Sequence, residues 1–129
     1  MSYLSKVKIE AMSRGVIVLD QNIETLKPFL QERNIKVIEP PTGMKDPDII
    51  RLLLPHRILV TNNVIDFKKE ASSFEFGIIG VPKSLMANPE NAAALVSKAL
   101  TDHKLWAKRH GFLVTLSVKG KSTMEDLKD

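Results

Sequence analysis

The chain has 129 residues, of which 43% are hydrophobic and 26% are charged, and its formal net charge at pH 7 is +4. This length fits a single domain with its own core, and the composition is that of an ordinary globular protein rather than a disordered or fibrous one. The chain has no cysteine, which excludes disulfides and thiolate metal ligands and fits a reducing, cytoplasmic setting. The positive net charge favours an anionic partner, of which nucleic acid is the commonest.

We expect neither an export signal nor a membrane span. Charged side chains between Lys6 and Arg14 interrupt the N-terminal segment, which argues against a signal peptide. No apolar stretch reaches the roughly 20 residues needed to cross a bilayer. We expect one domain over residues 1–129, with residues 1–14 as an N-terminal extension and residues 119–129 as a flexible tail.

The first part of the chain is predicted to form two strands around a helix. The continuous apolar run Val16–Leu19 is typical of a strand that is covered on both faces. Helical spacing of apolar residues predicts a helix over residues 26–33, with Thr25 as its N-cap and Pro28 in its first turn. A short strand over residues 35–38 ends before two prolines, which cannot donate to a ladder.

The rest of the chain continues the alternation. Asp46 followed by proline is a favoured helix start, with the aspartate as N-cap, and this helix ends at Pro55. Strands are predicted over residues 58–61, 77–81 and 112–118, and helices over residues 67–72 and 89–104. We therefore expect an α/β fold of three layers, with a central, mostly parallel sheet of four to five strands flanked by helices.

Three aspartates stand where such a sheet binds ligands. Asp20 follows the first strand, Asp46 opens the helix before the third strand, and Asp66 follows that strand. Ligands of open α/β sheets bind in the crevice beyond the carboxyl ends of the strands, so acids that arrive there from separate segments can converge. Carboxylate oxygens suit Mg²⁺ or Mn²⁺, and a hard cation held by carboxylates indicates phosphate chemistry.

Each aspartate also has a purely structural interpretation. Asp46 can be explained as a helix cap, and Asp20 with Asn22 as an Asx-type turn after a strand. Asp66 can be explained as a solvated acid in a loop. If the aspartates share no function, all three structural interpretations must hold at once by coincidence.

Three motifs occur in order between about Val16 and Val81. Residues 18–23 read V-L-D-Q-N-I, residues 46–50 read D-P-D-I-I, and residues 59–67 read L-V-T-N-N-V-I-D-F. They resemble, in the same order, the D-x-N motif, the helix-opening aspartate and the L-V-T-x-N-x-x-D-F segment of the PIN-domain superfamily. That superfamily consists of metal-dependent ribonucleases and includes the toxins of many prokaryotic toxin–antitoxin pairs.

The resemblance implies a compact PIN-like domain that hydrolyses phosphodiester bonds in RNA with Mg²⁺ or Mn²⁺. Asp20, Asp46 and Asp66 would be the metal ligands and catalytic carboxylates. Asn22, Thr61 and Asn63 would support them by fixing a carboxylate or contacting phosphate, and Thr61 would donate to Asp20. The resemblance also implies a homodimer and an antitoxin protein as a partner.

The chain departs from the larger PIN domains. It lacks their long helical insert, which carries a further glutamate ligand, because only one helix and one strand separate Asp20 from Asp46. Gln21 stands where compact members more often have an acid. The candidates for a fourth acid are Glu39, at the end of the second strand, and Asp48.

A basic segment follows the longest helix and is a candidate RNA-binding surface. Its cations would follow the phosphates while the tryptophan stacks on a base. The alternative is a solvated helix end with the tryptophan anchored in the core. The residues concerned are Lys104, Trp106, Lys108 and Arg109.

Two other functions stay open. A catalytically impaired PIN-like module would bind RNA or a protein partner without cutting. A flavodoxin-like or receiver-like domain would accept a phosphoryl group on Asp20, with Lys83 as its lysine, although the positive net charge argues against this alternative.

Overall fold

The computed structural model describes residues 15–108 and 110–127, so the extension expected over residues 1–14 lies outside the described residues. Its centre is a six-stranded sheet in the order β2-β1-β3-β4-β5-β6. The strands are β1 Val16–Leu19, β2 Lys36–Ile38, β3 Ile58–Thr61, β4 Gly77–Gly80, β5 Phe112–Leu116 and β6 Ser122–Asp126. Strands β1 to β5 are mutually parallel and β6 is antiparallel to β5. The predicted α/β class with a mostly parallel sheet is confirmed, with six strands instead of four to five.

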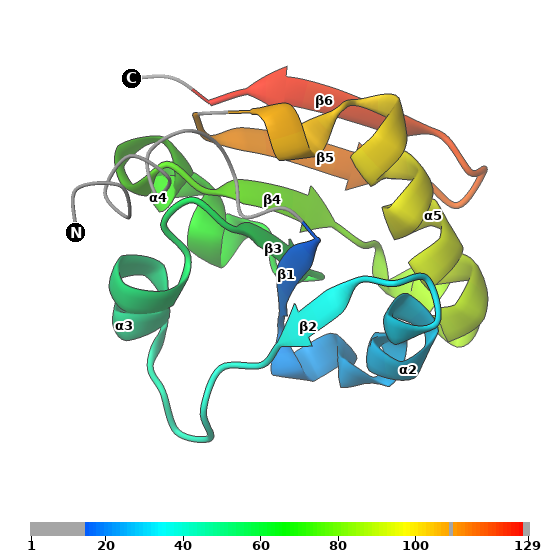
Figure 1. Cartoon of the computed structure of the whole chain (residues 1–129), viewed down its shortest axis with the longest axis horizontal. Helices are drawn as coiled ribbons and strands as arrows, with labels where there is room; N and C mark the ends of the chain where they lie inside the picture. The colour runs from blue at the N-terminus through cyan, green and yellow to red at the C-terminus, as the bar shows by residue number, and fades with distance from the viewer. Residues whose placement is uncertain (1–14, 109, 128–129) are drawn as a thin grey trace.

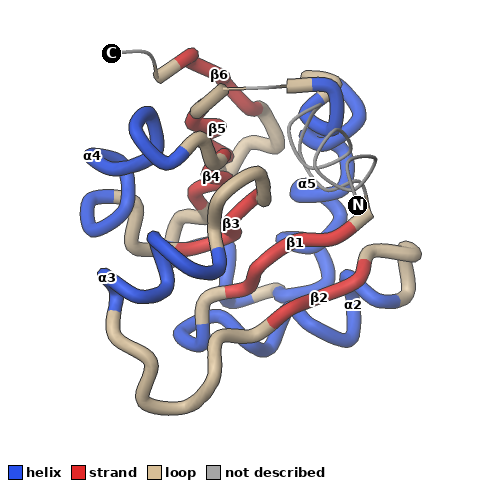
Figure 2. Tube along the Cα trace, turned by 60° about the vertical axis from the view of Figure 1, so that its left-hand side comes forward, coloured by secondary structure: helices blue, strands red, loops and turns tan. Residues whose placement is uncertain are grey.

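Helices cover both faces of this sheet and give three layers (Figures 1 and 2). One face, the α2–α5 face, carries η1 Gln21–Leu26, α2 Lys27–Gln31, η3 Lys83–Ala87, α5 Pro89–Asp102 and η4 Leu105–Ala107. The other, the α3–α4 face, carries α3 Asp46–Asp48, the π-helix η2 Ile49–Leu53 and α4 Ile65–Phe74. Within the described part of the chain, no helix combines the length and apolar character needed to span a bilayer.

Strand alternation divides the core into two clusters, one for each face. In β3, Ile58 and Val60 join the core of the α2–α5 face, whereas Leu59 joins Ile78 in the core of the α3–α4 face. All residues of β3 and β4 are buried, as expected for central parallel strands covered on both sides. The continuous apolar runs of the sequence follow from this double burial.

The crossover from β4 to β5 has the opposite hand to the other crossovers. The connection from β3 to β4 passes over the α3–α4 face, and that from β4 to β5 passes over the α2–α5 face, although both move the chain in the same direction across the sheet. The two earlier connections, from β1 to β2 and from β2 to β3, share the hand of the β3–β4 connection. Since nearly all such units are right-handed, the last crossover is the unusual one.

Helix starts differ in detail from the predictions. The helix expected over residues 26–33 is divided into η1 and α2, and Pro28 lies in the first turn of α2 as predicted, but Leu26 rather than Thr25 is the N-cap. The prediction that Asp46 is an N-cap is wrong, because Lys45 occupies that position and Asp46 is the first helical residue. The carboxylate of Asp46 is therefore not explained by capping.

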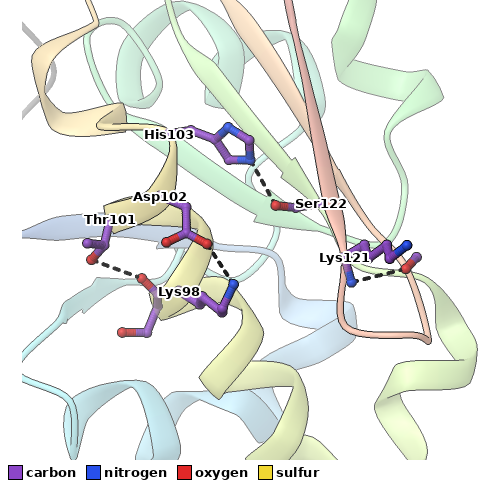
Figure 3. Close-up of polar contacts among 8 residues, drawn as sticks. Lys98, Thr101, Asp102, His103, Lys121 and Ser122 are labelled. Carbon is purple, nitrogen blue, oxygen red and sulfur yellow. Dashed lines mark hydrogen bonds and ion pairs between the residues drawn. The ribbon is translucent and has the colours of Figure 1, made fainter.

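Residues 122–126, within the segment 119–129 that was expected to be a tail, form the edge strand β6. β6 pairs with the whole of β5, from Ser122 opposite Leu116 to Asp126 opposite Phe112. Figure 3 shows how the hairpin is fixed: the backbone N–H of Lys121 donates to Ser117 Oγ, and Ser122 Oγ lies 2.8 Å from Nε2 of His103 at the end of α5. The polar composition of β6 is typical of an edge strand, which is open to water on one side.

Candidate functional site

The carboxyl ends of β1 and β3 bring two polar side chains together. Leu19 lies opposite Val60 in the ladder, so Asp20 follows beside Thr61, and strand alternation turns both toward the α3–α4 face. The backbone N–H of Asp20 donates to the carbonyl of Val60 at 3.0 Å, which continues the ladder by one residue. Thr61 Oγ1 then donates to Asp20 Oδ2 at 2.6 Å, so the hydrogen bond predicted from the sequence is confirmed.

Thr61 connects this pair to the loop that follows β3. The residue is 0% exposed, and its hydroxyl also accepts the backbone N–H of Asn63 at 2.9 Å. The side-chain amide of Asn63 in turn donates to Asp66 Oδ2. A continuous series of hydrogen bonds therefore links the carboxylates of Asp20 and Asp66.

Asp20 also makes the Asx-type turn that its sequence context allowed. Its Oδ1 accepts the backbone N–H of Asn22 at 3.1 Å, and Asp20 is the N-cap of η1. An ionised carboxylate has about four lone-pair sites, and these two hydrogen bonds occupy one on each oxygen. The structural role of Asp20 thus leaves room for a cation.

Asp46 reaches the same place from the α3–α4 face. A cavity of about 190 Å³, the acidic cavity, is lined by Asp20, Asn22, Pro40, Asp46, Ile49, Leu59, Asn63 and Phe67. Although Asp46 is exposed as a whole residue, partial burial of its carboxyl group raises its pKa, and the negative charges of Asp66 and then Asp20 raise it further. The carboxylates of Asp66 and Asp20 therefore lie near enough to Asp46 for their charges to act on it.

The donors of the acidic cavity are of the kind that a hard cation prefers. They comprise two carboxylates, Asp20 and Asp46, and the amides of Asn22 and Asn63. Among the described residues, no group of three or more His, Asp or Glu side chains is close enough to hold a metal ion on its own. The residues fit Mg²⁺ or Mn²⁺ held by one or two carboxylates and completed by water and substrate, rather than a closed protein cage.

No protein-family model matches the chain, and no curated protein or solved structure is significantly similar to it. A fold of this class supports many unrelated functions. The function is therefore inferred from the chemistry of the site.

The two candidates for a fourth acid pair with cations elsewhere. Glu39 Oε1 lies 2.6 Å from Lys27 Nζ, and Asp48 Oδ1 lies 3.1 Å from Arg51 Nη2. Neither residue lines the acidic cavity. Gln21, whose role the sequence did not indicate, donates from Nε2 to the carbonyl of Pro40 at 3.1 Å and so holds one wall of the cavity.

The basic segment lies apart from the acidic cavity. Trp106 packs against the core of the α2–α5 face, which supports its interpretation as a core anchor. Lys108 Nζ lies 3.8 Å from Asp126 Oδ1, beside the amino end of β5, whereas the acids follow carboxyl ends of strands. Lys104 is exposed at the start of η4, and Arg109 lies outside the described residues.

A second cavity, the lysine cavity, adjoins the acidic one. It has a volume of about 440 Å³ and is lined by Asn22, Asn62, Asn63 and Lys83. Asn22 and Asn63 line both cavities, so the two are contiguous. The signal that could have identified this group is that its members follow the ends of β1, β3 and β4.

Proposed function

We propose that this protein is a PIN-like, divalent-metal-dependent endoribonuclease whose site is the acidic cavity. The observation that carries the proposal is the meeting of Asp20 and Asp46 in one cavity, with the charge of Asp66 acting on Asp46. This cavity lies between β1 and β3, whose connections leave the sheet toward opposite faces. Ligands of doubly wound sheets bind at such a switch point.

The order of the motifs gives the proposal its second support. Asp20 and Asp46, which line one cavity, are two of the three acids that the resemblance to PIN domains selects, although 26 positions separate them in the sequence. Capping does not explain Asp46, and the Asx turn of Asp20 leaves its carboxylate able to bind a cation. The biological setting that goes with this function is a toxin acting on RNA and neutralised by an antitoxin protein, with the toxin as a homodimer.

In the proposed reaction the residues of the chain hold the reactants and move a proton. Asp20 and Asp46 would hold Mg²⁺ or Mn²⁺, and Asn63 would orient Asp66. When bound, such a cation offsets negative charge on phosphate oxygens and lowers the pKa of water. Asp46 is suited to accept the proton of the attacking water, because burial and the charges of Asp66 and Asp20 raise its pKa and make its carboxylate a stronger base than that of an ordinary aspartate.

The experiment that tests the proposal compares Asp20→Asn with Asp48→Asn. Both substitutions remove one carboxylate charge, but Asp48 lies outside the acidic cavity and pairs with Arg51. We expect Asp20→Asn to reduce Mn²⁺-dependent cleavage of single-stranded RNA by about 100-fold or more and to weaken Mn²⁺ binding in calorimetry without RNA. Asp48→Asn should behave like the wild type, and circular dichroism should show both variants folded. Undiminished cleavage by Asp20→Asn refutes the assignment.

The impaired RNA-binding module is the second candidate. It is favoured by the pairing of Glu39 with Lys27 and of Asp48 with Arg51, which leaves the acidic cavity without a fourth acid. A wild-type protein that binds RNA equally well with and without Mn²⁺ and never cuts it would fit only this candidate.

The flavodoxin-like or receiver-like alternative is not favoured. The strand order β2-β1-β3-β4-β5 is that of flavodoxin-like sheets. With right-handed crossovers throughout, however, the helix after β4 would lie on the same face as α4, whereas α5 lies on the opposite face.

A further inference from the structure

The unusual crossover from β4 to β5 opens a second crevice at the carboxyl edge of the sheet. The chain leaves β3 toward the α3–α4 face and leaves β4 toward the α2–α5 face. Neighbouring strand ends whose connections diverge in this way are where ligands of α/β sheets bind. The lysine cavity lies there, since its lining residues follow β1, β3 and β4.

The lining of the lysine cavity suits an anion. Its residues are one lysine and three asparagines, with no carboxylate among them. Lys83 is exposed and takes part in none of the ion pairs formed among the described residues. An ammonium group beside carboxamide donors offers charge-assisted hydrogen bonds to phosphate oxygens.

The wall of this cavity is held in place by the fold. The backbone N–H of Asn63 is bonded to the buried Thr61, and its side-chain amide is bonded to Asp66. At the end of β4, a Cβ on Gly80 would lie 2.6 Å from Val64 Cγ2. The absence of that Cβ lets the loop after β3 pack on the end of β4, beside Lys83. The amide of Asn63 is thus ordered before a ligand arrives, which lowers the entropic cost of binding.

We infer that the lysine cavity binds a phosphate group of an RNA backbone, next to the phosphate that is attacked in the acidic cavity. The inference rests on the proposed function, because it is the shared wall of Asn22 and Asn63 that makes the two cavities one continuous track for a strand. Lys83 is then a positioning residue that places the scissile phosphate among the carboxylates. It takes no part in proton transfer.

The first arm of the test measures RNA binding in EDTA, where metal-dependent cleavage does not occur. Lys83→Gln is compared with Lys36→Gln, since Lys36 is also exposed but begins β2 at the opposite edge of the sheet. We expect Lys83→Gln to weaken binding of a single-stranded RNA about tenfold and to lower the slope of log K against log salt by about 0.7, as loss of one phosphate contact predicts. Lys36→Gln should leave the slope unchanged.

The second arm uses inorganic phosphate alone. We expect phosphate to shift the side-chain amide NMR signals of Asn22, Asn62 and Asn63 in Lys36→Gln, as in the wild type, and to shift them much less in Lys83→Gln. Equal shifts in the two variants together with equal salt slopes overturn the inference. If the protein cleaves RNA but Lys83→Gln does not change RNA binding, the inference about the lysine cavity is wrong and the proposed function still holds. If inorganic phosphate binds at Lys83 but the protein neither binds nor cleaves RNA, the phosphate site is supported and the proposed ribonuclease function is refuted.

Discussion

The hydroxyl of Thr61 fixes two parts of the candidate site at once. It donates to Asp20 and accepts from the backbone of Asn63 inside a fully buried environment. Thr61→Val keeps the shape of the side chain but leaves both partners without their hydrogen bond. We expect a loss of about 1–2 kcal/mol in the free energy of unfolding, measured in urea, and Mn²⁺ affinity lower by about tenfold, measured by calorimetry. Thr61→Ser retains the hydroxyl and should bind Mn²⁺ as the wild type does. Wild-type affinity in Thr61→Val would contradict this role.

Asp46 makes folding stability depend on pH. Its pKa is raised in the folded state by partial burial and by Asp66 and Asp20, so the folded protein holds this proton more tightly than the unfolded chain does. The resulting stabilisation is complete below the unfolded pKa and is lost as the pH rises through the folded pKa. At neutral pH the ionised carboxylate therefore opposes folding.

Asp46→Asn should accordingly raise the melting temperature at pH 7. The gain should be less than about 1 kcal/mol, because the residue is exposed and the repulsion is screened by water. It should shrink in high salt and vanish below about pH 4, where the wild-type carboxyl is protonated. Thermal unfolding over a pH series measures this, with Asp48→Asn as the control that should show no such gain. A melting temperature at pH 7 that is unchanged or lower would count against the repulsion.

At single positions, the sequence was informative where a side chain follows a strand. The hydrogen bond between Thr61 and Asp20 was expected from the resemblance, and it forms because Thr61 ends β3 and Asp20 follows β1, which pairs with β3. The pairing of Glu39 with Lys27 could not be predicted, since it depends on how β2 sits against α2. The sequence likewise gave no reason for Lys45 rather than Asp46 to occupy the N-cap position.

Among the elements, β4 depends on a residue without a side chain. A Cβ on Gly77 would lie 2.0 Å from Cζ of Phe112, whose ring is fully buried in the neighbouring strand. Gly77→Ala should therefore lower the free energy of unfolding by about 2–3 kcal/mol, as overpacking of a core does. Urea denaturation measures the loss. The double variant Gly77→Ala with Phe112→Leu should recover part of it, and additive losses would show that the two residues do not collide.

Two elements could not be identified from the sequence for physical reasons. β6 contains one apolar residue, Met124, which packs on the core of the α2–α5 face. A single apolar residue gives no alternation of apolar and polar positions from which a strand could be predicted. The widened π-turn over Ile49–Leu53 is invisible to a helical periodicity of 3.6 residues. The strongly apolar strands β1, β3 and β5 were predicted because double burial leaves a clear signal.

On the scale of the whole molecule, β6 covers β5, which would otherwise be the edge of the sheet. A chain that ends at Val118 would leave the backbone groups of β5 unpaired along one side. We expect that truncation to lower the free energy of unfolding by at least about 2 kcal/mol and to increase aggregation, measured by urea denaturation and light scattering. Ser122→Ala, which removes only the contact to His103, should cost less than about 1 kcal/mol. A truncated chain as stable as the whole would contradict the role given to β6.

The class of the fold could be predicted from the sequence, but the route of the chain through the sheet could not. Alternating strands and helices imply parallel strands and three layers, because a crossover must cover a face of the sheet. They do not fix the order of the strands or the hand of one crossover. The lysine cavity depends on that hand, which is why the grouping of Lys83 with Asn62 emerges only from the structure.

The placement of α5 has a consequence for the protein while it is being synthesised. α5 covers the same core as η1 and α2, which the ribosome releases far earlier. Until residues up to about Leu105 have emerged, Leu26 of η1 and Leu30 of α2 lack the helix that packs against these elements. Nascent chains of intermediate length would therefore expose apolar surface and depend on chaperones, since contacts between distant segments form late.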